Sequence, residues 1–379
     1  MRNRIEKDSL GEKEISYEAY YGISTAREHE NTQIIKRSIS RQMIKALAVV
    51  KKAAAKANQD AGFLEANKAK LIMLSCDEIL NGRLHGQFIT DLIQGGEGAG
   101  MHVNANEVIA NRANEMKGFE KGTYAYIDPI KDVSLNQTTS DVISICGKIA
   151  SIRLAKKLLT ELKKLYNAFL DKSIATKETN SNLSNEFLSI ANGISRSYKR
   201  IDVSLDNLKV IHYSVDIDTI EDEMLKKFYK KWNFYIGKFT LESFEISKEL
   251  PDSFQDLEAL NSLSDNLELL AGNLSKICNA LLFLSTTLGD KEQSIILPVV
   301  DNYSDNKYQT NILEVVQQVS LFAYGTAATV SRAVEFSYLR SLSYEPIILM
   351  SIFEMITMLR RATRTLREKV IEGIEVKNA

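Results

Sequence analysis

Proline is scarce in this sequence, with four residues in 379. Because proline interrupts helices, so low a content permits long unbroken ones. Glycine is also sparse, and its 18 residues gather in a few places. Helix-forming residues dominate the remainder, so the sequence predicts an all-α, or mainly α, fold.

Cysteines and histidines are also few, and the net charge is close to zero. The cysteines Cys76, Cys146 and Cys278 lie far apart within apolar helical patterns, which is typical of buried free thiols in a reducing compartment. The four histidines show no metal-ligand spacing, and there is no P-loop or dinucleotide fingerprint, so we expect no metal and no cofactor. The 48 basic residues balance 49 acidic ones, which argues against a nucleic-acid partner or a polybasic membrane-surface protein.

Long hydrophobic runs are absent as well. A membrane span needs about 20 apolar residues in a row. The nearest candidate, EPIILMSIFEMITMLRRATRTL, contains Glu345 and Glu354 and includes several arginines. The N-terminal MRNRIEKDSLGEKE carries charges where a signal peptide has an apolar core. We therefore expect a cytoplasmic protein without a membrane partner.

The pattern of glycine and apolar residues changes near residue 140. Residues 1–140 hold most of the glycines, and the turns and short helices expected of a compact N-terminal domain. Beyond it, apolar residues recur every three or four positions over long stretches, at about 142–172, 219–250, 257–287, 311–343 and 346–374. Helices of this length need one another's apolar faces, so we expect residues 141–379 to form an elongated bundle and oligomerisation domain.

The most distinctive segment is QGGEGAGMHVNANEVIANR, at residues 94–112. Its four glycines within seven positions predict a loop, and the apolar spacing of the residues that follow predicts a helix. A glycine loop at a helix N-terminus presents free amide N–H groups, which suit a carboxylate or a phosphate. Many such loops bind nothing, so this feature alone predicts only a candidate anion site.

Motifs on both sides of this loop share the order and spacing of one family. They include EAYYGISTAREHEN, KALAVVKKAAAKAN, GTYAYIDP, NQTTSD and KICNALLFLS. On these motifs the sequence resembles the aspartase/fumarase superfamily, and within it the aspartate ammonia-lyase branch. The resemblance implies a five-helix bundle per subunit, a tetramer, and elimination of ammonia from an amino-dicarboxylate. It also implies a small third domain, which we expect to be absent because the chain stops after VIEGIEVKNA.

The family's glycine loop is altered here. Ala99 and Gly100 stand where the family has a threonine and a serine, and His102 stands where it has an asparagine. The resemblance implies that Gly98 and Asn106 still bind substrate. A histidine beside such a loop is a candidate acid or base near neutral pH, although a packing or surface role is the more common one.

Two further motifs are also changed. The family's Q-S-T-N-D reads Q-T-T-S-D at residues 137–141, and the resemblance implies that Thr138 and Thr139 bind a substrate carboxylate. Helix capping by Ser140 or Asp141 is the alternative interpretation. The family's Gly-Arg-Thr-His or Gly-Arg-Thr-Gln segment has no secure counterpart in IATKETNSNLSNEF.

The fourth motif carries the family's chemistry. There, a mobile Gly-Ser-Ser loop supplies a serine base, and a lysine neutralises carboxylate charge. The corresponding VVDNYSDNKYQTNIL has Lys307 and Gln309 at two substrate-binding positions, whereas Ser304, the candidate base, lies off the catalytic position. A serine that deprotonates carbon needs exact loop geometry, so this change should remove many kcal/mol of barrier reduction.

Two hypotheses of different class remain. The first is a divergent aspartate ammonia-lyase-like protein, a carbon–nitrogen lyase scaffold that acts on an aspartate-like amino-dicarboxylate if active and has lost ordinary aspartase activity. The second is a non-catalytic pseudoenzyme that serves as an oligomeric scaffold, either as a homotetramer or as a mixed oligomer with an active paralogue. A small dicarboxylate or amino-dicarboxylate is the expected ligand.

Overall fold

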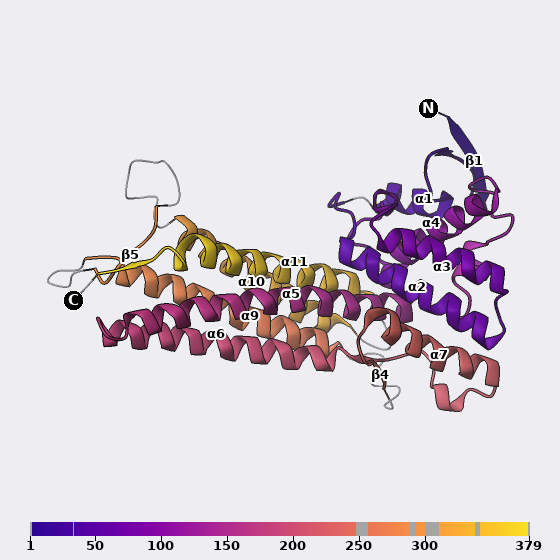
Figure 1. Ribbon diagram of the computed structural model, residues 1–379. Helices are drawn as coiled ribbons and strands as arrows, with labels where there is room; N and C mark the ends of the chain where they lie inside the picture. Colours follow the sequence, from indigo (N-terminus) through magenta and orange to yellow (C-terminus); the bar gives the residue numbers. More distant parts are fainter. Residues whose placement is uncertain are drawn as a thin grey trace. The chain divides into compact units, whose positions relative to one another are not determined.

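The computed structural model describes residues 2–32, 34–247, 257–287, 293–299, 311–337 and 342–377. Helices dominate these ranges, which confirms the predicted mainly α class (Figure 1). The strands form three two-stranded sheets within the described residues. The chain divides into two compact units, and each unit draws on separate parts of the sequence.

The first unit comprises Met1–Ser151, Leu208–Leu257 and Ala333–Met350. It opens with an antiparallel hairpin of β1 (Asn3–Asp8) and β2 (Gly11–Ser16). A parallel pair joins β3 (Val210–Ile211) to β4 (Glu245–Ile246). Its complete α-helices are α1 (Ile23–Thr32), α2 (Arg41–Ala61), α3 (Ala66–Leu80), α4 (Ala99–Lys117) and α7 (Glu223–Thr240). Short helical turns are η1 (His85–Gln87), η2 (Gly96–Gly98), η3 (Pro129–Val133) and η4 (Ile217–Thr219).

Helix α2 forms the centre of this unit. Ser40 caps its N-terminus, where the Ser40 hydroxyl accepts a hydrogen bond from the Met43 amide at 3.2 Å. Gly62 ends the helix with a φ of 95°, a left-handed conformation that glycine adopts without strain. Small alanines along α2 let α3 and α7 pack closely against it.

Helix α7 differs from its sequence-based prediction. The pattern at 219–250 predicts a bundle helix, but the helix spans Glu223–Thr240 and packs along α2 in the first unit. Trp232 is fully buried, and its indole N–H donates to the Val50 carbonyl at 3.1 Å. The Phe228 and Trp232 rings stack with centroids 5.3 Å apart. This aromatic face finds its partner on α2, which apolar periodicity alone does not specify.

The second unit comprises Ile152–Asn207, Glu258–Arg332 and Ser351–Ala379. It contains α6 (Ser181–Asn207), α9 (Glu258–Leu284) and the greater part of α5 (Thr139–Thr176), α10 (Asn311–Phe336) and α11 (Glu345–Leu366). The π-helical turn η6 (Arg367–Ile371) follows α11, and β5 (Ile295–Ile296) pairs antiparallel with β6 (Glu375–Val376). The units are discontinuous and divide within α5, whereas the boundary after residue 140 stays a prediction.

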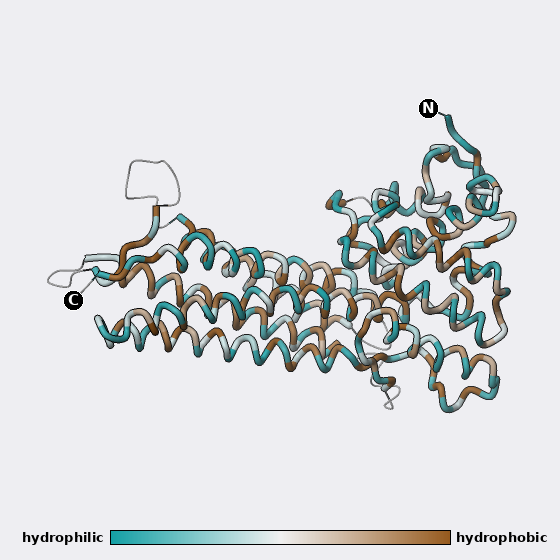
Figure 2. Tube along the Cα trace, in the orientation of Figure 1, coloured by the Kyte–Doolittle hydropathy of each residue, from teal (hydrophilic) through white to brown (hydrophobic). Residues whose placement is uncertain are grey.

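Helix α6 was not predicted from the sequence. Its buried residues form a single stripe, with Leu183, Phe187, Ala191 and Ile194 spaced three or four apart. Three serines, Ser184, Ser197 and Ser204, are buried along the same stripe. This stripe packs on α9. Figure 2 shows brown and teal alternating along the helices of this unit. These polar residues weaken the apolar periodicity by which the sequence would predict the helix.

Among the described helices, α9 is the one long and apolar enough to cross a membrane by length and composition. Core helices of soluble proteins pass the same test. The leucines Leu263, Leu267, Leu270 and Leu274 of α9 are fully buried. Packing inside the bundle thus accounts for these leucines of α9.

Candidate functional site

The glycine loop precedes α4, as predicted. Gly96, Glu97 and Gly98 have φ angles of 57°, 59° and 85°, so three consecutive residues lie in left-handed conformations. A Cβ atom on Gly98 would lie 2.9 Å from Met101 Cε and 3.3 Å from Ile143. Space and backbone conformation together favour glycine at position 98. Gly98, predicted to bind substrate, is buried and packs against these apolar side chains.

The amide groups expected to bind an anion are partly used within the protein. Gln94 lies in the loop, and its side-chain oxygen accepts a hydrogen bond from the Met101 amide at 2.9 Å. A Cβ on Gly100 would lie 2.8 Å from Gln94 Oε1 and 2.8 Å from Glu28 Cγ. The space that a side chain at position 100 needs is therefore filled by Gln94 and Glu28.

His102 is the centre of a buried polar network. Its Nε2 lies 2.6 Å from Lys51 Nζ, and its Nδ1 lies 3.0 Å from Thr139 Oγ1. Lys51 also donates to Gln137 Oε1 at 2.8 Å. These contacts fit a neutral imidazole that accepts from Lys51 and donates from Nδ1 to Thr139. His102 and Thr139, two of the predicted site residues, are thus brought together.

Burial governs the charges of this network. Lys51 is fully buried, and burial lowers the pKa of its ammonium to about 7. Burial and the positive charge of Lys51 hold the pKa of His102 well below its usual value. His102 is 4% exposed, so it is a packed member of the network instead of an accessible acid. Lys51 was missed in the sequence, although a lysine four residues from both Leu47 and Ala55 on an apolar face is a signal.

Thr138 caps α5. Its hydroxyl accepts a hydrogen bond from the Asp141 amide at 3.1 Å, and its carbonyl accepts from the Val142 amide at 3.2 Å. The capping residue is therefore Thr138, and not Ser140 or Asp141 as in the capping interpretation. Asp141 instead accepts hydrogen bonds from the Ser214 amide at 2.7 Å and the Ser214 hydroxyl at 3.0 Å. Burial raises the pKa of the Asp141 carboxyl to about 6.

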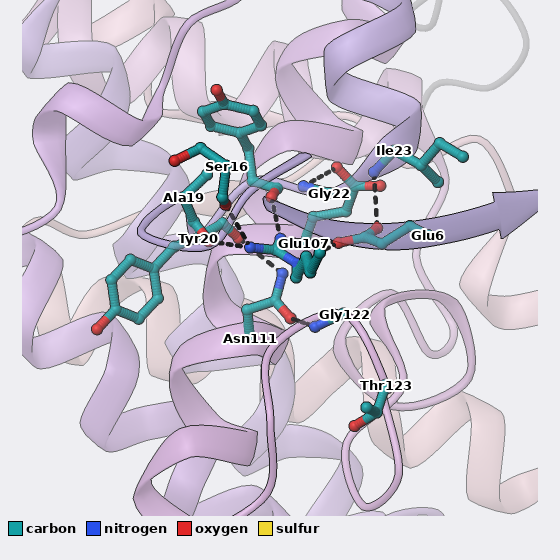
Figure 3. Close-up of polar contacts among 12 residues, drawn as sticks. Glu6, Ser16, Ala19, Tyr20, Gly22, Ile23, Glu107, Asn111, Gly122 and Thr123 are labelled. Carbon is teal, nitrogen blue, oxygen red and sulfur yellow. Dashed lines mark hydrogen bonds and ion pairs between the residues drawn. The ribbon is translucent and has the colours of Figure 1, made fainter. Parts of the chain in front are cut away.

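On α4, Asn106 and Glu107 lie about one turn beyond His102, and both are buried. The Asn106 side-chain oxygen has no hydrogen-bond partner among the described residues. Glu107 accepts a hydrogen bond from the Gly22 amide at 2.8 Å, just before α1 (Figure 3). It also accepts one from the Thr25 amide at 3.1 Å, in the first turn of α1. The glutamate of this motif therefore stabilises a helix N-terminus through its negative charge.

Three of the predicted site residues lie in a part of the chain that the structure does not describe. These are Ser304, Lys307 and Gln309. All three cysteines are free and buried, as predicted. Within the described ranges, no group of three histidine, cysteine or acidic side chains is placed to hold a metal ion.

A buried carboxyl group was also missed in the sequence. Glu345 begins α11 and is fully buried. Neither carboxylate oxygen makes a hydrogen bond of standard geometry among the described residues, although the Ser144 hydroxyl lies near enough to interact with the carboxylate. Burial raises the pKa of Glu345 to about 7, and the positive charge of Lys148 opposes this shift.

Comparison with known proteins agrees with this geometry. Residues 11–298 match the model of the Lyase family. The chain is 32% identical to the aspartate ammonia-lyase of Bacillus subtilis (strain 168) over 391 residues, which cover 98% of this chain and 82% of that protein. It is 33% identical to the aspartate ammonia-lyase of Helicobacter pylori (strain ATCC 700392 / 26695) over 398 residues, which cover 98% and 83%.

Solved structures give the same result. The fumarate lyase:delta crystallin of Brucella melitensis superposes with a TM-score of 0.91 at 30% identity, over 99% of this chain and 89% of that chain. The class II fumarase of Schistosoma mansoni shares the fold, with a TM-score of 0.90 at 21% identity, over 100% of this chain and 86% of that chain. Sequence motifs, fold and relatives agree, and the chain belongs to the Lyase family of the aspartase/fumarase superfamily.

Proposed function

We propose that this chain is a divergent aspartate ammonia-lyase-like protein that has lost ordinary aspartase activity. The filled glycine loop carries the proposal. Gln94 binds the Met101 amide, and Gln94 with Glu28 fills the space at Gly100 where the resemblance expects a serine side chain. A carboxylate substrate therefore lacks both a hydroxyl donor and one of the amide donors that this loop would offer.

The second motif supports the same proposal. Thr139 is engaged by His102, and the Thr138 hydroxyl accepts the hydrogen bond that caps α5. His102 is buried and linked to Lys51, so it cannot reach a substrate carbon without breaking this network. Catalysis in such a reaction depends on donors and a base that are positioned before substrate binds.

Fumarate production tests this proposal. The purified full-length chain is incubated with excess L-aspartate, and fumarate is followed by its ultraviolet absorbance. The aspartate ammonia-lyase of Bacillus subtilis serves as the active control. The proposal expects no fumarate above the rate without protein, and turnover comparable to the control would contradict it.

A second candidate function is supported by the bundle helices. Helix α10 exposes the apolar side chains of Val315, Leu321 and Phe322, which are 52%, 68% and 44% accessible. On α9, Leu269 and Phe283 are more than half exposed. Such side chains lose unfavourable contact with water when helices of another subunit cover them. We propose that the bundle assembles as a cytoplasmic homotetramer or with an active paralogue.

Native mass measurement tests assembly. The full-length chain is measured alone and after co-expression with an active relative, together with Leu321→Glu. We expect an oligomer that Leu321→Glu weakens, because the new charge would be buried at the interface. Asn185→Glu on α6 is the matched control, since it adds the same charge at an exposed polar position. A monomer at all working concentrations would contradict this role.

A further inference from the structure

Glu97 occupies an unusual backbone position in the glycine loop. Its φ of 59° and ψ of 23° lie in the left-handed region, between two glycines that also have positive φ. A residue with a Cβ atom adopts this conformation at a cost that glycine avoids. Contacts of the Glu97 side chain can offset that cost.

The Glu97 carboxylate makes such contacts with two distant segments of the first unit. One oxygen accepts a short hydrogen bond from the Ser140 hydroxyl in the first turn of α5. The other accepts from the Leu342 amide at 3.2 Å, just before α11 begins. A hydroxyl and a backbone amide that converge on one carboxylate are the donors expected of a carboxylate-binding site.

The surroundings of Glu97 are compact and include a second, buried carboxyl group. Gly98 beside it is buried and has no space for a side chain. Buried Glu345 lies close enough for the charge of Glu97 to help raise its pKa, after the larger effect of burial. A neutral Glu345 carboxyl spares Glu97 the repulsion of a second negative charge.

We propose that Ser140 and the Leu342 amide form a carboxylate-binding site, and that Glu97 occupies it as a ligand supplied by the chain itself. The glycine loop thus binds its own side chain in place of a small-molecule carboxylate. This inference rests on the proposed function, since it gives a reason why an ordinary carboxylate substrate is not bound at this loop. The ligand class that fits the vacated site is a small carboxylate such as formate or acetate.

Binding measurements on Glu97→Gly test the inference. This variant removes the carboxylate and accepts the left-handed backbone, so both donors remain in place for an added ligand. Acetate binding is measured by titration calorimetry at constant ionic strength, with chloride as the competing simple anion. We expect acetate to bind Glu97→Gly about tenfold to a hundredfold more tightly than wild type, the range expected for a charge-assisted hydrogen-bond pair.

Two controls and one replacement variant make the result decisive. The double variant Glu97→Gly with Ser140→Ala removes one donor and should lose most of the gained affinity. Glu186→Gln removes one exposed negative charge on α6 and should bind acetate like wild type. If Glu97→Gly does not fold, Glu97→Asn serves in its place, because asparagine tolerates the left-handed backbone and removes the negative charge.

Equal acetate affinity in wild type and the folded Glu97 variant would overturn the inference, as would equal binding of chloride. The measurement does not depend on turnover. If wild type converts aspartate to fumarate, the proposed function fails while the acetate result still decides the role of Glu97.

Discussion

The buried carboxyl of Glu345 makes a sharp prediction about stability and pH. Glu345 is fully buried at the first position of α11, and its oxygens make no hydrogen bond of standard geometry among the described residues. Burial raises its pKa from 4.5 to about 7. Between these values the folded protein holds the proton more tightly than the unfolded chain, so the free energy of unfolding falls as pH rises.

The size of this effect follows from the shift. Each unit of difference in pKa between the folded and unfolded states corresponds to about 1.36 kcal/mol. For a pKa that rises from 4.5 to about 7, the part of this free energy that is lost between about pH 5 and about pH 8 is about 2.5 kcal/mol. Glu345→Gln is neutral at both pH values, so it lacks this loss. The wild type should therefore lose about 2.5 kcal/mol relative to Glu345→Gln across that interval.

Urea denaturation at about pH 5 and about pH 8 measures the difference, because the slope and midpoint yield the free energy of unfolding. Other titrating groups contribute to both proteins and cancel in the comparison. Glu186→Gln, which replaces an exposed glutamate on α6, should follow wild type at both pH values. Parallel pH dependence of wild type and Glu345→Gln would refute the assignment of a raised pKa to Glu345.

Three further predictions concern the loop, the buried network and the α1 junction. Gly100→Ala should lower the free energy of unfolding by about 1–3 kcal/mol because its Cβ meets Gln94 and Glu28 at 2.8 Å, whereas Gly95→Ala, with open space around it, should change it little in the same urea assay. Because burial lowers the pKa of Lys51 to about 7, only the unfolded chain keeps the Lys51 proton between about pH 7 and about pH 10, so the free energy of unfolding of wild type should rise across this interval. Lys51→Met should reduce this rise, as measured by denaturation at several pH values. Glu107→Gln should cost about 2 kcal/mol in thermal or urea unfolding, because it weakens charge-assisted bonds to the start of α1.

Much of the architecture was predictable from the sequence. Few prolines, clustered glycines and three- to four-residue apolar spacing predict the helical class, the loop before α4 and the long helices α5, α9, α10 and α11. Periodicity reports which face of a helix is apolar, but it does not identify the partner that covers that face. Helix α7 therefore packs on α2 through Trp232, and α6 escapes prediction because serines interrupt its stripe.

The site was only partly predictable. Sequence analysis identifies the loop and names His102 and Thr139, which do meet. Lys51 and Glu345 lie within segments that the sequence already singles out, but their functional interest was missed because their unusual environment arises only on burial. The substrate-binding role of Thr138 stays a prediction, and the structure adds that its hydroxyl caps α5. A capping hydroxyl accepts through its oxygen and keeps its own proton to donate, so the cap does not exclude that role.

Fumarate formation by the purified full-length chain with L-aspartate tests the central claim most directly. With the loop filled by Gln94 and Glu28 and His102 held by Lys51, we expect an absorbance trace that matches the protein-free control. Turnover in the ordinary enzyme range of about 1–1,000 per second would contradict the proposed loss of aspartase activity.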